Sequence, residues 1–175
     1  DIERPLRYET MADDVAALLD HLGLAQADWF GYSMGGGTAL QGALRHREKI
    51  HRLIIASVTY NSNGYHPGML EGISKISADD FAGSPMEQAY RETAPHPEQW
   101  AGVIEKVRVM DSEPQAWSED AIRAIDAPAL LIYGDADVIT LEHAVALFRL
   151  LGGGVAGDMV GLPKAQLAVM PGGTH

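Results

Sequence analysis

The feature that most constrains the fold of this chain is a glycine-rich stretch around one serine, Gly31-Tyr32-Ser33-Met34-Gly35-Gly36-Gly37. It lies between a short apolar run at residues 27–30, which reads as a strand, and residues 34–47, which have the amphipathic spacing of a helix. Glycines two positions before and after a serine, at a strand-to-helix junction, are typical of a tight turn with strained backbone angles. We expect both positions to need residues without bulk, so that the chain can pack against itself and Ser33 can project from the strand end.

A serine displayed at such a turn is a candidate nucleophile. The helix that begins at Met34 would direct its first N–H groups and the positive end of its dipole toward a group bound at Ser33. The Met34 N–H is therefore the expected donor to an oxyanion. An ordinary tight turn is the alternative interpretation, because glycine-rich sequences produce this pattern by chance.

Three further apolar segments read as strands, at residues 52–58, 129–133 and 166–170, while residues 8–22 and 140–151 read as helices. Apolar residues on both faces of a strand are expected in a buried parallel sheet. The alternation of strands and helices predicts an α/β fold with a parallel sheet and flanking helices. The chain has 175 residues, of which 46% are hydrophobic, so it can bury a sizeable core.

A serine nucleophile needs a histidine as its base and an acid that orients the histidine. The second and third of these strands are followed by Gly134-Asp135-Ala136-Asp137 and by Pro171-Gly172-Gly173-Thr174-His175. Because functional residues of open α/β sheets collect at the C-terminal strand ends, we predict Asp137 as the acid and His175 as the base. Asp135 is expected to be a turn residue, which is also the simpler interpretation of Asp137. The other strand end that could supply an acid, residues 57–63, contains no Asp or Glu.

Residues 60–126 break the alternation of strands and helices. A structureless loop of that length is improbable in a compact domain. We therefore predict a helical insertion at residues 61–120 that forms a cap or lid over one end of the sheet. Residues 1–60 and 121–175 would form the core.

The predicted insertion is rich in thioethers and flat rings, which suit an apolar acyl or alcohol group: Met69, Met86, Tyr90, Trp100, Met110 and Trp117. Packing in the insertion's own small core is the simpler interpretation for most of them. Tyr32 next to the serine, Met110 and Trp117 are the candidate substrate-binding residues. No Arg or Lys lies beside the three motifs, so the expected substrate is a neutral, moderately hydrophobic ester.

Composition excludes several other classes of protein. The net charge is −11 and the sequence has no basic run, which argues against nucleic acid as a partner. No stretch approaches about 18 uninterrupted apolar residues, so no membrane span is expected. There is no cysteine, which excludes disulfides and thiolate ligands and leaves the compartment open.

The other histidines show no convincing metal-ligand spacing and are expected to be surface or packing residues, so we expect no metal and no cofactor: His21, His46, His51, His66, His96 and His143.

On the three motifs around Ser33, Asp137 and His175, the chain resembles the α/β-hydrolase fold superfamily, in particular its capped serine esterases. The resemblance implies that Ser33 is the nucleophile, His175 the general base and then acid, and Asp137 the residue that orients the imidazole. It also implies an acyl-enzyme intermediate that water hydrolyses, with a carboxylic ester as substrate. A C–C bond (diketone) hydrolase or a lactonase of the same fold is the alternative, and a non-catalytic ligand-binding or sensing module is a third.

The chain departs from that family at both ends. It has no counterpart of the strands that usually precede residue 8, of the loop that supplies the second oxyanion donor, or of the helix that usually follows the histidine. These departures suggest a fragment of a longer enzyme, with the second donor outside this chain. The nucleophile strand would then be an apolar edge, and we expect it to pair with a second copy or with a missing segment.

Overall fold

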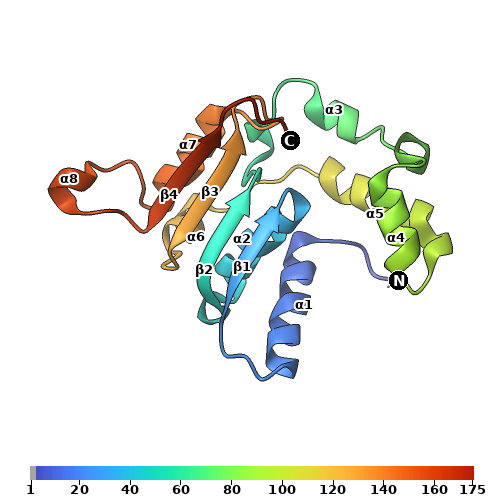
Figure 1. The fold of residues 1–175 in the computed structure, drawn as a ribbon, viewed down its shortest axis with the longest axis horizontal. Coiled ribbons are helices and arrows are strands. Elements are labelled where there is room, and N and C mark those ends of the chain that lie inside the picture. Colours follow the sequence, from blue (N-terminus) through green and yellow to red (C-terminus); the bar gives the residue numbers. More distant parts are fainter. Residues whose placement is uncertain (1–2) are drawn as a thin grey trace. The chain divides into compact units, whose positions relative to one another are not determined.

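The computed structural model describes residues 3–175 of the chain, which include a four-stranded parallel sheet (Figure 1). The strands are β1 (Ala27–Tyr32), β2 (Ile50–Ala56), β3 (Ala129–Gly134) and β4 (Ala165–Met170). They lie in the order β1-β2-β3-β4, and each strand pairs in parallel with the next. All four C-terminal ends therefore meet at one edge of the sheet.

The two central strands, β2 and β3, carry the most buried side chains of the sheet, whereas β1 and β4 lie at its edges. Leu53 and Ile55 of β2 and Leu131 of β3 have no exposed surface. Helix α2 (Met34–Arg45) packs on β1 and β2, and α7 (Leu141–Leu150) packs on β3 and β4. This arrangement confirms the α/β class predicted from the alternating pattern.

The remaining helices include one that precedes the sheet and several short ones. Helix α1 (Tyr8–His21) packs against α2, and it ends close to the glycine at position 23. The others are α3 (Met69–Ile73), α4 (Pro85–Thr93), α5 (Trp100–Ser112), α6 (Glu119–Arg123) and α8 (Gly157–Val160). Four 3-10 turns complete the described elements: η1 (Arg47–Lys49), η2 (Ser62–Gly64), η3 (Ala78–Phe81) and η4 (Pro97–Gln99). No helix among residues 3–175 is long and apolar enough to cross a membrane.

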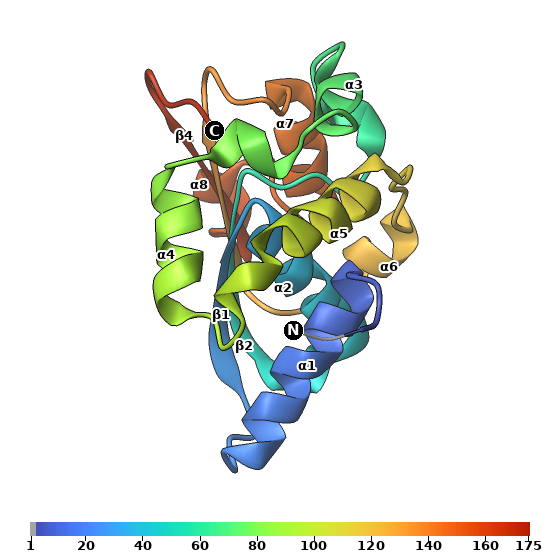
Figure 2. The same cartoon turned by 90° about the vertical axis from the view of Figure 1, so that its right-hand side faces the viewer.

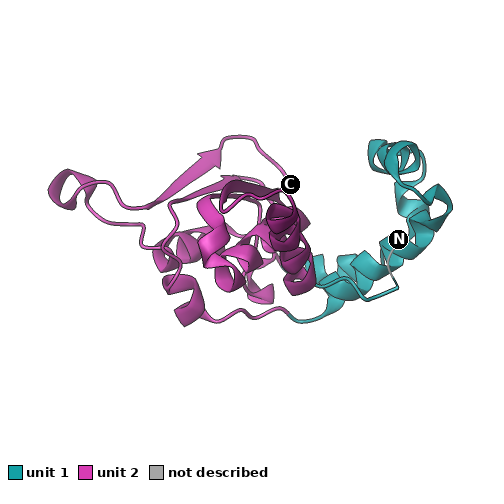
Figure 3. Ribbon diagram, turned by 90° about the horizontal axis from the view of Figure 1, so that it is seen from below, with its two compact units in different colours: residues 1–7, 67–114 teal, residues 8–66, 115–175 magenta. Residues whose placement is uncertain are grey.

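The chain forms two compact units (Figure 3). Unit 2 contains residues 8–66 and 115–175, and so holds the whole sheet. Unit 1 contains residues 1–7 and 67–114, with helices α3, α4 and α5 in green to yellow in Figure 2. Inside unit 1, Trp100 is buried and its ring contacts the rings of Phe81 and Tyr90. The interpretation of residues 61–120 as a cap or lid stays a prediction.

The end of β2 differs from the sequence-based expectation. The strand was expected to reach Val58, but it ends at Ala56 because Ser57 takes a left-handed backbone conformation with a φ of 52°. The Ser57 N–H still donates to the Ile132 carbonyl of β3, but the extended backbone of the strand stops before Ser57. β1 lies at an edge of the sheet, as expected.

Candidate active site

The junction of β1 and α2 holds Ser33 in a strained conformation, with a φ of 53° and a ψ of −120°. The Ser33 N–H donates to the carbonyl of Ala56 at 2.9 Å, which ties the turn to the neighbouring strand. A Cβ on Gly31 would lie 2.1 Å from the carbonyl oxygen of Gly35, so Gly31 leaves room for the chain that follows. A Cβ on Gly35 would meet nothing within 4 Å. The expectation that both positions must lack bulk is therefore wrong for Gly35, whose backbone, rather than its missing side chain, makes the close approach.

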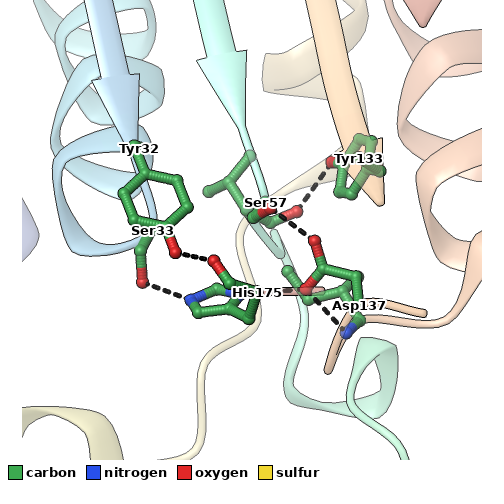
Figure 4. A network of polar contacts seen from close by, with 8 residues as sticks. Tyr32, Ser33, Ser57, Tyr133, Asp137 and His175 are labelled. Atoms are coloured by element: carbon green, nitrogen blue, oxygen red, sulfur yellow. Dashed lines mark hydrogen bonds and ion pairs between the residues drawn. The ribbon is translucent and has the colours of Figure 1, made fainter. Parts of the chain in front are cut away.

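Ser33, His175 and Asp137 form a hydrogen-bonded chain across three strand ends (Figure 4). Ser33 Oγ lies 2.8 Å from His175 Nε2, and His175 Nδ1 lies 2.9 Å from Asp137 Oδ1. With its proton on Nδ1, the imidazole donates to the carboxylate and accepts the hydroxyl proton of Ser33. The structure thus brings together the three residues that the motifs singled out.

Asp137 is the buried member of this chain of bonds, since its side chain has no exposed surface. Burial alone would raise the pKa of the carboxyl group. Hydrogen bonds from Ser57 and His175, the charge of a protonated His175 and the Ile139 N–H outweigh burial, so the pKa lies below its usual value. Asp137 is therefore a carboxylate at neutral pH and can only accept hydrogen bonds.

The turns after β3 and β4 pack closely because Gly134 has no side chain where the backbone of Gly173 approaches it. A Cβ on Gly134 would lie 2.1 Å from the carbonyl oxygen of Gly173. That carbonyl accepts the Ala136 N–H at 2.9 Å. These contacts bring the turn that carries Asp137 against the turn that carries His175. Asp135 is exposed, as expected for a turn residue, and its N–H donates to the Met170 carbonyl at 3.1 Å.

The two residues beside Ser33 have different surroundings. Tyr32 is exposed, its hydroxyl donates to the backbone oxygen of His175, and the two ring centroids are 5.3 Å apart. Met34 is the first residue of α2, so its N–H has no acceptor within the helix. That N–H belongs to the residue directly after Ser33, and its role as an oxyanion donor stays a prediction.

The other two candidate substrate-binding residues lie in different packing environments. Trp117 belongs to unit 2, where it packs against the core and meets the ring of Tyr8 edge-on at 5.5 Å. Met110 is buried on α5 of unit 1. A role of Trp117 or Met110 in substrate binding stays a prediction.

Sequence reasoning missed Ser57 as a partner of this site. Its hydroxyl donates to Asp137 Oδ2 from the end of β2. The sequence indicates only that Ser57 lies at the C-terminal end of a predicted strand, a region considered above as a source of Asp or Glu. His143 is a buried packing residue: it accepts the Tyr60 N–H at 3.2 Å, and burial lowers its pKa to about 4. Residues 3–175 contain no group of three or more metal-ligating side chains that could hold a metal ion.

Comparison with known proteins gives the same class of fold. The family model for the alpha/beta hydrolase fold matches residues 3–84. A 2-hydroxymuconate semialdehyde hydrolase from Pseudomonas sp. (strain CF600) is 29% identical over 157 residues, which cover 79% of this chain and 56% of the relative. The 3-oxoadipate enol-lactonase 2 of Acinetobacter baylyi is 26% identical over 167 residues, covering 78% of this chain and 56% of the relative. The chain thus spans just over half the length of these curated relatives.

Solved structures extend the likeness to the whole chain. A thermophilic esterase from Thermogutta terrifontis aligns with a TM-score of 0.62 and 24% identity, over 99% of this chain and 67% of the esterase. A meta-cleavage product hydrolase from Pseudomonas fluorescens IP01 aligns with a TM-score of 0.66 and 18% identity, over 100% of this chain and 67% of the hydrolase. The order of the parallel sheet and its alignment with these solved structures define an α/β-hydrolase fold. The chain is thus similar to alpha/beta hydrolases in sequence over residues 3–84 and in fold over nearly its whole length.

Proposed function

We propose that this chain is the nucleophile-bearing part of a serine hydrolase that cleaves carboxylic esters through an acyl-enzyme. The observation that supports it best is the bond series from Ser33 Oγ to His175 Nε2, 2.8 Å, and from His175 Nδ1 to Asp137 Oδ1, 2.9 Å. Each residue has a chemical task that its position permits: attack, proton transfer and orientation of the imidazole.

In the proposed reaction, Ser33 Oγ attacks the ester carbonyl carbon while His175 Nε2 takes the hydroxyl proton. The resulting oxyanion accepts a hydrogen bond from the Met34 N–H, at the positive end of α2. As the tetrahedral intermediate collapses, His175 gives its proton to the leaving alkoxide, and the acyl group remains on Ser33. Water then attacks the acyl-enzyme with His175 as base, which releases the acid and restores the hydroxyl of Ser33.

Asp137 would act without losing its charge. Its carboxylate accepts the Nδ1–H of His175, which leaves Nε2 as the basic nitrogen toward Ser33. The carboxylate also stabilises the imidazolium that forms during attack. A depressed pKa suits this task, because a protonated Asp137 could do neither.

Hydrolysis of a C–C bond or of a lactone is the second candidate, since the two curated relatives described above are named a semialdehyde hydrolase and an enol-lactonase. Both reactions can use the same three residues. Turnover of short p-nitrophenyl esters, of a small lactone and of a vinylogous diketone would separate the three activities. Preference for the diketone would reject the ester assignment while retaining Ser33 as the key residue.

Labelling with a fluorophosphonate, followed by mass mapping, tests the role of Ser33. The expected result is one adduct on Ser33 that is lost in Ser33→Ala. Ser74→Ala is a matched control, because Ser74 is, like Ser33, a part-exposed serine, and its hydroxyl bonds the local carbonyl of Glu71. Adduct formation elsewhere, or none on Ser33 in the folded protein, would refute the proposal. Ligand binding that persists in Ser33→Ala without turnover would favour a binding module.

We also propose that the edge of β1 pairs with further chain, from a second copy or from a segment outside these 175 residues. The side chain of Phe30 on this strand is 67% exposed, which is unusual for a large aromatic residue in a sheet. Light scattering of the purified protein measures its mass in solution. A monomer of 18.8 kDa with full turnover would contradict this pairing.

A further inference from the structure

Ser57, at the C-terminal end of β2, is held in a conformation that serine rarely adopts. Its φ is 52°, and among residues 3–175 only Ser33 shares a positive φ without being glycine. Such a backbone is strained, and it persists only where the surrounding contacts hold it. The side chain is buried and its hydroxyl donates to Asp137 Oδ2 (Figure 4).

Two contacts to β3 hold the backbone around Ser57 in place. The Ser57 N–H donates to the Ile132 carbonyl at 2.9 Å. The hydroxyl of Tyr133, itself buried, donates to the Val58 carbonyl at 2.8 Å. Burial, and after it the charge of Asp137, raises the pKa of Tyr133 well above its usual value, so this hydroxyl keeps its proton. The peptide unit before Ser57 and the one after Val58 are thereby fixed to β3, the strand that precedes Asp137.

The bond from Ser57 occupies the carboxylate oxygen that His175 does not use. Asp137 Oδ1 accepts from the imidazole at 2.9 Å and from the Ile139 N–H at 3.3 Å, whereas Oδ2 accepts from Ser57. Donors on both oxygens resist rotation of the carboxylate about its last torsion angle. They also compensate for burial, which would be costly for a charge with an unpaired oxygen.

We propose that Ser57 is a positioning residue that fixes the carboxylate of Asp137, so that Oδ1 stays directed at Nδ1 of His175. The inference rests on the proposed function for the roles of Asp137 and His175. The Ser57 hydroxyl donates to Asp137 and acts on the nucleophile through that carboxylate. Its hydrogen bond is also the largest of the favourable influences that lower the pKa of Asp137.

Two substitutions separate the hydroxyl of Ser57 from its backbone strain. Ser57→Ala removes the hydroxyl and keeps a side chain at positive φ, while Ser57→Gly removes the hydroxyl and relieves the strain. If Ser57 positions Asp137, both variants lose about tenfold in kcat with little change in KM, although glycine is the more stable of the two. Thr59→Val is the control: it deletes another buried hydroxyl nearby, which bonds Gln115 and not Asp137. That variant should keep the wild-type kcat.

A second readout does not depend on turnover. With ¹³C-labelled aspartate, the carboxyl resonance of Asp137 should titrate at a higher pH in Ser57→Ala and Ser57→Gly than in the wild-type protein and in Thr59→Val. Unchanged midpoints in both variants would overturn the inference, and so would a normal kcat in Ser57→Gly beside a defective Ser57→Ala, since the defect would then follow strain. If the wild-type protein neither hydrolyses esters nor takes the phosphonate label, the proposed function fails, and the titration still decides whether Ser57 holds Asp137.

Discussion

The ends of β1 and β2 each carry a serine with nearly the same φ, but the two serines have different hydrogen-bond partners. Ser33 and Ser57 each follow the last residue of a strand, with φ values of 53° and 52°, and the preceding residues Tyr32 and Ala56 are paired across the sheet. Each serine N–H donates to a carbonyl of the next strand at 2.9 Å. Ser33 is nevertheless part-exposed and bonded to a base, whereas Ser57 is buried and bonded to an acid.

The difference shows that the strained turn alone does not define a nucleophile. After Ser33 the chain enters α2 at once, so unpaired helix N–H groups lie beside the hydroxyl. After Ser57 the chain continues through buried residues 58–60 without a helix, and the hydroxyl meets a carboxylate. A carboxylate neighbour favours a serine that donates one hydrogen bond and keeps its proton, and a helix N-terminus favours one that reacts.

The largest expected difference between the two serines is in kcat. Under the proposed function, Ser33→Ala should lower kcat by about 10⁵- to 10⁶-fold, because it removes the hydroxyl that forms the acyl-enzyme. Ser57→Ala should lose only about tenfold, since the nucleophile and base remain. Steady-state hydrolysis of the ester with the highest turnover measures both. Losses of similar size in the two variants would mean that Ser57 is as close to the chemistry as Ser33.

Glycine at the β1 turn provides the next largest effect. Gly31→Ala should cost about 3 kcal/mol or more of unfolding free energy, because the new Cβ would overlap the Gly35 backbone at 2.1 Å. Gly35→Ala is the matched variant, and we expect it to be neutral or stabilising by up to about 1 kcal/mol, since its Cβ meets nothing within 4 Å. Urea denaturation compares them. Equal losses would show that the turn excludes side chains at both positions.

Much of the site could be predicted from the sequence because its polar residues directly follow apolar strands. A serine between glycines, an Asp and a His each follow a strand, and parallel strands end at the same edge of the sheet. Ser57 gave no such signal. Glycine and Asn are the usual residues at positive φ. A serine such as Ser57 therefore does not indicate a positive φ in the sequence. Its role depends on a contact with Asp137 across 80 positions of sequence.

The apolar residues were harder to interpret than the polar ones. Trp117 could equally have lined a pocket or filled a core, since a ring at helical or loop spacing suits both. In the structure it packs on Tyr8, a contact between residues far apart in the chain. Every strand limit was predicted to within two residues, and the predicted end of β2 was two residues too late because hydropathy carries no information on the φ of Ser57. Unit boundaries at residues 67 and 114 likewise depend on contacts rather than on composition.

Replacement of each serine by glycine should shift stability in opposite directions. Ser33→Gly relieves a strained φ and gives up only a part-exposed hydrogen bond, so we expect a gain of about 1 kcal/mol. Ser57→Gly relieves the same strain but leaves a buried carboxylate oxygen without its hydroxyl donor, so we expect a net loss of about 1 kcal/mol. Thermal and urea unfolding of the two variants test the signs. Shifts of the same sign would imply that the buried bond to Asp137 contributes little.

The smallest expected effect is on the response of stability to acid. The pKa of Asp137 is lowered in the folded state, so its contribution is fully present above the ordinary value of 3.8 and is lost as the pH falls through the folded value. Ser57→Gly brings the folded pKa closer to the ordinary one, so less stability should be lost between about pH 6 and about pH 3, by under about 1 kcal/mol. Ser33→Gly leaves the donors to the carboxylate of Asp137 in place, so it should lose as much unfolding free energy over this pH range as the wild-type protein. Urea unfolding across this range tests the difference, and a wild-type loss in Ser57→Gly would mean that the other donors, His175 and Ile139, set the pKa of Asp137.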